Sequence, residues 1–369
     1  MKYAGLVLAV ASTAFGQSLI EVLGGRPELS QLTGLLNSSG LAGDLSSLTN
    51  NTLLAPNNAA IGAFLNSSTG AAVATDSALV QAILQYHVLQ GNYSTVNATA
   101  FIPTLLVPPQ YTNVTTGQVV QANATGSNVT FFSGLSSNSS VVNASIPFSG
   151  GTIHIINRFL TVPQNISTTG VALNLTSAVG AIGQLNLTQA VDYTPDLTVF
   201  LPNNAAFQRI GGNLANLTVE QLAGIFAYHI VNGTVLYSTD IQNGTSVETT
   251  GGNVTLTLQG SNVFVNNARV IRPNVLVANG VVHVIDRVLN PANTTATPNA
   301  STTEEAFPGA TSASNEPFTS GVPTPTSAVP TTSAAGGSSS SSGGAWRPIE
   351  TGAIGMVALF GGAAVVMNI

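Results

Sequence analysis

The sequence predicts an α+β protein that contains two copies of one domain. Three blocks recur in the same order in its two halves: residues 52–61 match 198–207, 86–89 match 228–231, and 151–160 match 280–289. In each half, apolar residues first recur at helical spacing and later alternate as they do in strands. Repetition of ordered blocks indicates a duplicated domain, and helices followed by strands indicate an α+β domain.

The helical signal is strongest just before the Tyr-His dipeptide of each half. Residues 218–221, Thr-Val-Glu-Gln, form a capping box in the second half, and Asp76 is the expected N-cap in the first. The apolar stripe that follows ends at a histidine in both halves: Val80, Ile83, Leu84 and His87, and Leu222, Ile225, Phe226 and His229. Each stripe predicts an amphipathic helix whose histidine faces the core.

Strands are predicted later in each half. Val254, Leu256 and Leu258 alternate with threonines, and the turn residues 260–262 lead into a second short strand at 263–265. The apolar runs 153–156 and 281–285 are typical of strands that are buried on both faces.

Composition excludes several classes of function. Of the 369 residues, 44% are apolar but only 6% are charged, against roughly 25% charged residues in an ordinary soluble protein. The net charge is −6 and the one lysine is Lys2, so the basic surface that drives nucleic-acid binding is missing. Cysteine is absent, and each domain must therefore be held by its own core without disulfides.

The N-terminus predicts secretion. Lys2 precedes an apolar run, and Ala14-Phe15-Gly16 places small residues where signal peptidase cuts, so residues 1–16 are interpreted as a signal peptide.

The C-terminal residues 345–369 are predicted to be a spacer and a hydrophobic tail that are removed when a glycosylphosphatidylinositol (GPI) lipid is attached. Residues 338–344 are all Ser and Gly, and 352–369 are apolar with nothing basic beyond them. Attachment is expected at Ser342 or Gly343, and a single-pass membrane anchor is the alternative. Residues 291–344 are rich in Ser, Thr, Pro and Gly and predict a disordered, O-glycosylated stalk.

N-glycosylation is the third sign of the secretory route. Nineteen Asn-x-Ser/Thr triplets occur, and that number in a secreted chain predicts a surface coated with sugar. The acceptors are Asn37, Asn50, Asn66, Asn92, Asn97, Asn113, Asn123, Asn128, Asn138, Asn143, Asn165, Asn174, Asn186, Asn216, Asn232, Asn243, Asn253, Asn293 and Asn299.

The three repeated blocks resemble the fasciclin family, whose domains enter a helix from a Thr-Val-Phe-Ala-Pro-like strand and close on a Val-His-Val-Ile-Asp strand. The resemblance covers residues 17–162 and 163–290 and implies two tandem domains, each a wedge-shaped β-sandwich with flanking helices. The motif positions are Pro56 and His154 in the first copy, and Pro202, His283 and Asp286 in the second. The first copy departs from the family at Asn157, where Asp is usual.

Catalysis and metal binding are not expected. The repeat accounts for all four histidines, and no third ligand is apparent beside either pair, whereas a zinc site needs three or four ligands. No G-x-S-x-G elbow occurs. A glycosidase carboxylate pair could only be drawn from a few acids, which are more typical of caps and loops: Asp192, Asp196, Glu220, Asp240, Glu248 and Asp286.

The predicted function is adhesion or extracellular interaction at the cell surface, with proteins and glycans of the surface or cell wall as partners and no cofactor. In animal relatives of the fasciclin family the Tyr-His segment is linked to integrin-type adhesion, which makes Tyr86, His87, Tyr228 and His229 candidate contact residues. The alternative for these residues is a purely structural place in the core. Two alternative functions stay open: a cell-wall structural or polysaccharide-binding glycoprotein, favoured by an exposed aromatic row, and a carrier of small hydrophobic ligands, favoured by an apolar cavity in one domain.

Overall fold

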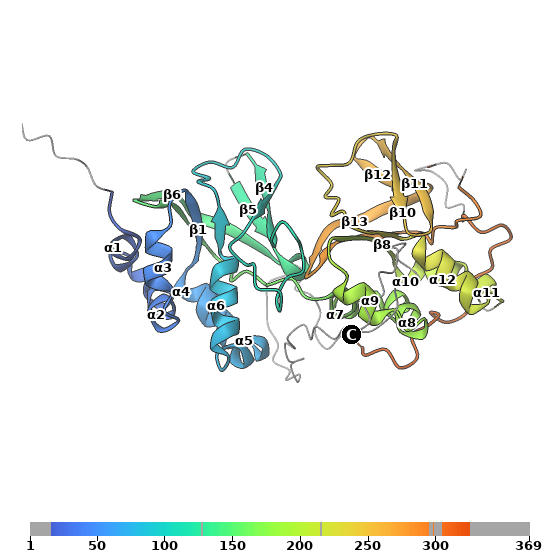
Figure 1. Ribbon diagram of the computed structural model, residues 1–369, viewed down its shortest axis with the longest axis horizontal. Helices are drawn as coiled ribbons and strands as arrows, with labels where there is room; N and C mark the ends of the chain where they lie inside the picture. The colour runs from blue at the N-terminus through green and yellow to red at the C-terminus, as the bar shows by residue number, and fades with distance from the viewer. Residues whose placement is uncertain (1–15, 127, 215, 295–297, 299–304, 325–369) are drawn as a thin grey trace, which may run out of the picture.

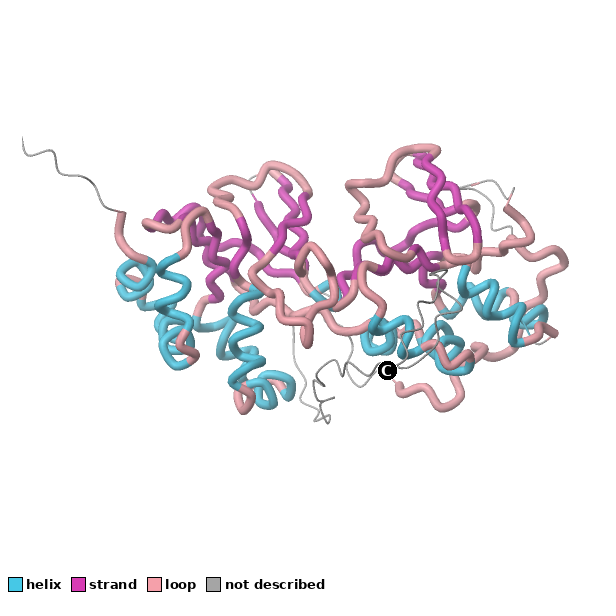
Figure 2. Tube along the Cα trace, viewed as in Figure 1, coloured by secondary structure: helices cyan, strands magenta, loops and turns pink. Residues whose placement is uncertain are grey.

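The computed structural model describes residues 16–126, 128–214, 216–294, 298 and 305–324. Figures 1 and 2 show two similar bodies side by side, each with strands on one side and helices on the other. The N-terminal body is the first domain and the C-terminal body the second.

The elements follow the predicted order, helices before most of the strands. The first domain contains α1 (Leu19–Gly24), η1 (Pro27–Leu29), α2 (Ser30–Ser38), α3 (Leu41–Ser47), β1 (Asn51–Pro56), α4 (Asn58–Leu65), α5 (Ser68–Val73), α6 (Ser77–Tyr86), β2 (Val88–Gln90), β3 (Ala100–Pro103), β4 (Val119–Thr125), β5 (Asn128–Phe132), η2 (Gly134–Ser136), β6 (Asn138–Phe148) and β7 (Gly151–Ile156). The second contains α7 (Ile166–Ala172), α8 (Thr176–Gln184), α9 (Thr188–Tyr193), β8 (Leu197–Pro202), α10 (Asn204–Arg209), α11 (Gly211–Leu214), α12 (Val219–Ala227), β9 (Ile230–Val231), β10 (Thr245–Thr249), β11 (Gly252–Gln259), β12 (Asn262–Val265), β13 (Ala268–Val277) and β14 (Gly280–Ile285).

The two sheets have the same strand order, which confirms the duplicated domain. The order is β2-β1-β7-β6-β5-β4-β3 in the first and β9-β8-β14-β13-β12-β11-β10 in the second. In both, the strand that leads into the helical region pairs in parallel with the last strand, and the registers match: Leu54 lies opposite His154, and Phe200 opposite His283.

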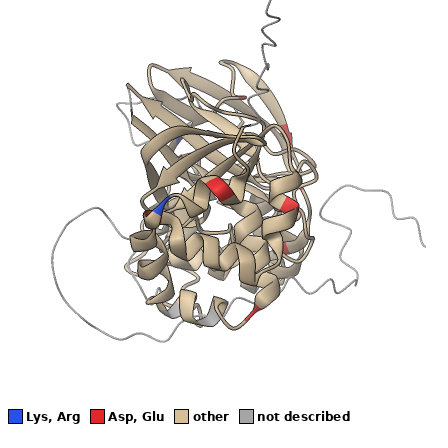
Figure 3. Cartoon of the chain, turned by 90° about the vertical axis from the view of Figure 1, so that its left-hand side faces the viewer, with Lys and Arg blue, Asp and Glu red and all other residues tan. Residues whose placement is uncertain are grey.

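Each sheet bends into a sandwich at one long strand. β6 and β13 both pair with the last strand of their domain through two register shifts, between Val141 and Ile146 and between Val270 and Val275. A bulge bends the strand and increases its twist, so one end of the strand continues the central sheet and the other carries the hairpins above it. Figure 3 shows the strands as a layer over the helices. The predicted α+β sandwich with flanking helices is confirmed.

Proline and asparagine explain the turn from strand to helix in the first repeated block. Pro56 and Pro202 end their strands, and proline cannot donate a ladder hydrogen bond. The next residues, Asn57 and Asn203, cap α4 and α10 through side-chain oxygens that accept a backbone N–H at 2.8 Å. The shared spacing of the block therefore has a local structural reason in both copies.

The two domains contact each other through polar groups of three loops. The hydrogen bonds that join them include Asn113 N–H to the Ala278 carbonyl (2.6 Å), Gln118 Nε2 to the Val277 carbonyl (3.0 Å), and Thr115 N–H to Asp196 Oδ1 (2.8 Å). The rings of Phe101 and Tyr237 stack across the same boundary with centroids 4.0 Å apart. These contacts therefore hold the two domains in one relative orientation.

Residues 305–324, named the strap from here on, correct part of the stalk prediction. The segment lies as coil against α8, α10 and α11 of the second domain, in the orange part of the trace in Figure 1. Ala306 and Phe307 are 1% and 8% exposed and belong to the core of the second domain, and the Phe318 ring packs at right angles to the ring of Phe207. The composition is too poor in apolar residues to form a core of its own, but these three side chains complete an existing one.

Hydrogen bonds and glycines fix the strap in place. The Ala313 N–H donates to the Gln208 carbonyl at 2.8 Å, and the Gly212 N–H donates to the Thr311 carbonyl at 2.9 Å. A Cβ atom on Gly180 of α8 would lie 1.7 Å from the Phe318 carbonyl oxygen. The helix surface thus has room for the strap only because this residue has no side chain.

The predicted signal peptide, apart from Gly16, and the predicted C-terminal tail lie outside the described residues. Within the described part of the chain, no helix combines the length and apolar character needed to cross a membrane.

Candidate functional site

His87 and His229 end the α6 and α12 segments inside the cores. His87 Nδ1–H donates to the Ile83 carbonyl at 2.8 Å, and its Nε2 accepts the Leu160 N–H at 3.0 Å. His229 forms the same two hydrogen bonds with the matched residues of the second domain, at 2.7 and 3.0 Å. Burial lowers the pKa of both imidazoles to about 4. Both rings are therefore neutral, with the proton on Nδ1.

His154 and His283 lie in the central strands and use the opposite tautomer. His154 Nδ1 accepts the Ser145 N–H at 3.2 Å, and Nε2–H donates to the Tyr93 carbonyl at 2.7 Å. His283 makes the matched pair of contacts at 3.4 and 2.8 Å. Burial lowers the pKa of both, that of His283 to about 4. Each histidine therefore connects a strand to a loop that crosses the sheet.

Tyr86 and Tyr228 connect the same helical segments to the sheet. The Tyr86 hydroxyl donates to the Val119 carbonyl at the start of β4 (2.9 Å), and the Tyr228 hydroxyl donates to the Asn253 carbonyl in β11 (2.7 Å). Together with the adjacent histidines they are at most 2% exposed. The prediction that these four residues contact an adhesion partner is therefore corrected: their side chains hold the helix to the sheet, out of a partner's reach.

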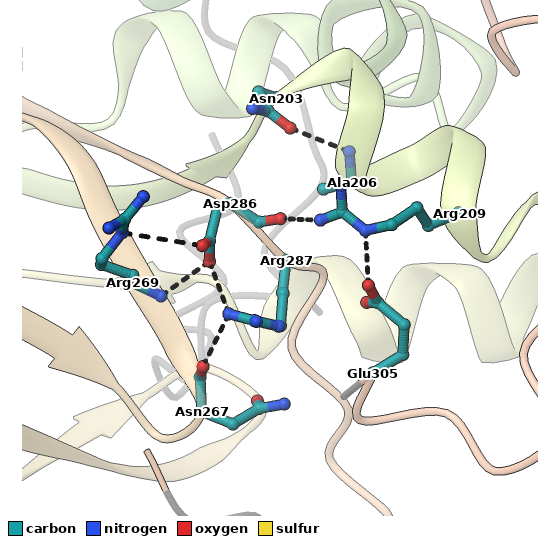
Figure 4. Close-up of polar contacts among 8 residues, drawn as sticks. All are labelled: Asn203, Ala206, Arg209, Asn267, Arg269, Asp286, Arg287 and Glu305. Atoms are coloured by element: carbon teal, nitrogen blue, oxygen red, sulfur yellow. Dashed lines mark hydrogen bonds and ion pairs between the residues drawn. The ribbon is translucent and has the colours of Figure 1, made fainter. Parts of the chain in front are cut away.

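The amide oxygen of Asn157 accepts the same backbone hydrogen bond that the carboxylate of Asp286 accepts in the second domain. Asp286 Oδ1 accepts the Arg269 N–H at 2.8 Å, and Asn157 Oδ1 accepts the matched N–H of Ser140 at 2.9 Å. The aspartate has a further role, because its carboxylate also binds the side chain of Arg287 at 3.0 Å (Figure 4). Arg287 is only 5% exposed. The change to Asn157 therefore leaves the backbone contact in place and removes an ion-pair partner.

The remaining acids do not converge on a reaction site. Asp192 is buried, which raises its pKa to about 6, and it accepts the Ser167 N–H at 2.9 Å. Asp196 lies at the domain contact and Asp240 accepts the Tyr237 N–H. Among the residues that the structure describes, no group of three or more His, Asp or Glu side chains is placed to hold a metal ion.

The first domain contains a cavity that no sequence motif predicts. It has a volume of about 280 Å³ and lies between α2, α4, α5 and α6, where Leu35, Ile61, Phe64 and Leu84 line it. The only signal in the sequence is a difference between the repeats, since Ile61 and Leu84 align with Phe207 and Phe226.

Charged residues make up only 6% of the chain, and in the view of Figure 3 they lie at a few scattered positions along the ribbon. The 18 described sequon asparagines are all exposed or half-buried, which is consistent with the expected sugar coat. Asn113 is half-buried and its amide donates to the Tyr193 carbonyl at the domain contact. The large apolar side chains exposed in the described chain are aliphatic, and the most exposed are Val219, Val107 and Val142. They form no aromatic row of the kind that favours glycan binding.

Fold and buried contacts define a tandem protein of two equivalent α+β sandwich domains. The family model of the fasciclin domain matches residues 27–163 and 173–291, and the chain belongs to the fasciclin domain family.

Its relatives include fungal proteins of similar size. The chain is 37% identical to a fasciclin-like arabinogalactan protein of Arthroderma benhamiae over 89% of this chain and 80% of that protein. It is 31% identical to one of Cercospora beticola over 79% of this chain and 81% of that protein. A solved FAS1 domain pair of the insect cell adhesion molecule fasciclin I covers 71% of this chain and 96% of its own, with 20% identity and a TM-score of 0.35.

Proposed function

We propose that this chain is a non-catalytic adhesion or interaction glycoprotein of the cell surface or cell wall, acting through its two fasciclin domains. The names of the fungal relatives, fasciclin-like arabinogalactan proteins, support an extracellular or cell-wall place. The observation that carries the proposal is the fixed pairing of two equivalent domains whose accessible surface offers hydroxyl groups, amides and sugar acceptors. A cell-wall structural glycoprotein is the second candidate, favoured by the arabinogalactan relatives.

A fixed pair of weak binding surfaces suits adhesion. Two linked modules that engage together can gain about 10²–10⁴ in avidity, provided that their geometry allows both to bind. The hydrogen bonds at Asn113, Thr115 and Gln118 set that geometry in advance. Because the surface has little charge, adhesion should change little between low and moderate salt.

Loosening the domain contact tests the proposal. In cells that display the full chain, Phe101→Ala combined with Asp196→Ala removes the ring stack and a hydrogen-bond acceptor between the domains. We expect attachment to other cells, measured under flow, to fall about tenfold, because the two domains are then no longer held in the orientation that favours joint binding. Glu248→Ala, at an exposed acid in β10, is the matched control and should not change attachment. If the parent protein, the double variant and Glu248→Ala attach equally well, the two domains do not engage as a pair. If none of the three mediates attachment to cells but all bind isolated wall polysaccharide equally, the cell-wall structural candidate is supported.

Anchoring is proposed through a GPI lipid at Ser342 or Gly343. The residues involved are the Ser/Gly run 338–344 and the apolar end 352–369. Phosphatidylinositol-specific phospholipase should release the protein from intact cells. Retention on the cells, together with detection of the tail peptide by mass spectrometry, would instead support the single-pass anchor.

A further inference from the structure

The cavity of the first domain adjoins a larger hollow. The hollow has a volume of about 630 Å³ and shares Phe64, Ile83 and Phe159 with the cavity as lining residues. The rings of Phe64 and Phe159 stack there with centroids 4.4 Å apart. Taken together, the two spaces, named the trough from here on, fall within the size range of ligand sites in proteins, which is about 300–1,000 Å³.

The cavity part of the trough is mainly apolar, whereas polar side chains such as Thr69, Asn138 and Thr161 share the lining of the hollow with apolar ones. None of the residues that line the cavity part is charged, and its polar members are serines and threonines such as Ser38, Ser39 and Thr75. In the second domain, Phe207 and Phe226 replace Ile61 and Leu84, and Phe207 is further covered by the Phe318 ring of the strap. The second domain therefore uses its own aromatic rings where the first domain leaves space.

One cation lines the other end of the trough. Arg158 is exposed there, and among the described residues no carboxylate lies within ion-pair distance of it. The matched arginine of the second domain, Arg287, is buried and paired with Asp286. Because the first domain has Asn157 in place of that aspartate, Arg158 is left without the acid partner that its counterpart has.

Sequons at the rim disfavour a folded protein as the occupant. Asn37 and Asn66 are exposed and adjoin Ser38 and Leu65 of the cavity wall, and Asn138 lines the hollow. Sugars at these positions would keep a second protein surface away from the mouth, whereas a single slender chain can pass between them.

We infer that the trough binds an unesterified long-chain carboxylate, with the alkyl chain along Phe64 and Phe159 and the carboxylate on Arg158. The apolar wall takes the alkyl chain, and the guanidinium binds the headgroup by charge-assisted hydrogen bonds. This inference goes beyond the proposed adhesion function and does not rest on it.

Titration calorimetry with laurate, below its micelle concentration, tests the inference on the glycosylated full ectodomain. Methyl laurate has the same chain without the charge and serves as the second probe. Arg158→Gln should weaken laurate binding about tenfold and leave methyl laurate unchanged. Arg272→Gln, at an exposed arginine of the second domain, is the matched control and should leave both unchanged.

Substitutions that fill the cavity test the binding of the alkyl chain separately from the binding of the headgroup. Ile61→Phe and Leu84→Phe introduce the residues that the second domain carries at the matched positions, and each should abolish binding of both probes. Circular dichroism and the melting temperature of each variant check that the domain is folded. Binding of neither probe to the unmodified protein, or equal laurate affinity in Arg158→Gln, would overturn the inference.

Discussion

Replacing Gly180 by alanine should destabilise the second domain by about 2 kcal/mol, the order of the free energy of burying one large apolar side chain. The new Cβ would lie 1.7 Å from the Phe318 carbonyl oxygen, so the strap must leave α8 at this point. Its departure exposes the Phe207 face that the Phe318 ring covers. Thermal unfolding measures the loss of stability, and limited proteolysis should cut the strap of the variant much earlier than that of the parent protein.

The first domain supplies a matched control for this substitution. Gly34 occupies the corresponding position in α2 and has no atom within 4 Å of an added Cβ. Gly34→Ala should therefore stabilise by about 0.5–1 kcal/mol, because alanine is the better helix former. If both variants shift the melting temperature in the same direction, the strap does not contribute to the stability of the second domain.

Acid should destabilise both domains between pH 6.5 and 4. The buried His87, His229 and His283 have pKa values near 4, and they return to the ordinary value of 6.5 when the chain unfolds. In this window the unfolded chain binds more protons, so the free energy of unfolding falls as the pH is lowered. The full difference corresponds to about 3 kcal/mol for each histidine. Asp192, with its pKa raised to about 6, opposes the effect in the second domain.

Urea unfolding at pH 7, 5.5 and 4 should show this loss, and one substitution assigns it. His229→Gln should lower the stability at pH 7 by about 1–3 kcal/mol, because a glutamine cannot satisfy both buried backbone groups as well. The same variant should lose less stability between pH 6.5 and 4, since it has one titrating group fewer. His87→Gln gives the parallel result in the first domain. A pH dependence that is the same with and without His229 would show that other groups cause the acid sensitivity.

The features that could be predicted from the sequence are those with a local pattern. The helical stripe ending at His87 and His229 predicted their burial, because spacing of three and four residues places side chains on one face. The order of the repeated blocks predicted the two equivalent folds. The same reasoning left two readings of the Tyr-His dipeptide open, and only the hydrogen bonds of Tyr86 and Tyr228 to strands far along the chain decide between them.

The features that could not be predicted depend on contacts without periodicity. The strap packs Ala306, Phe307 and Phe318 against the core from a segment of low complexity, and the position of Phe318 depends on Gly180 in a distant helix. Apart from the stacked rings of Phe101 and Tyr237, the domain contact described above is made by backbone groups and polar side chains of loops, and their sequence does not differ from that of other loops. The cavity part of the trough is lined by Ile61 and Leu84 where the second domain has phenylalanines, and a single domain considered alone gives no reason to notice it.

The position of the strap has a mechanical consequence. A pull on the chain beyond residue 324 reaches the second domain through the strap, which is held by scattered contacts. These include hydrogen bonds of Thr311, Ala313 and Glu316, the Arg209–Glu305 ion pair and the Phe318 ring. Such contacts break in sequence, whereas the parallel strands β8 and β14 share six registered residue pairs that must yield together. Under tension we therefore expect the strap to detach before the sheet opens, and its twenty residues (305–324) can then span about 65 Å at full extension. The segment would then act as an extensible link that takes up force before the two folded domains unfold.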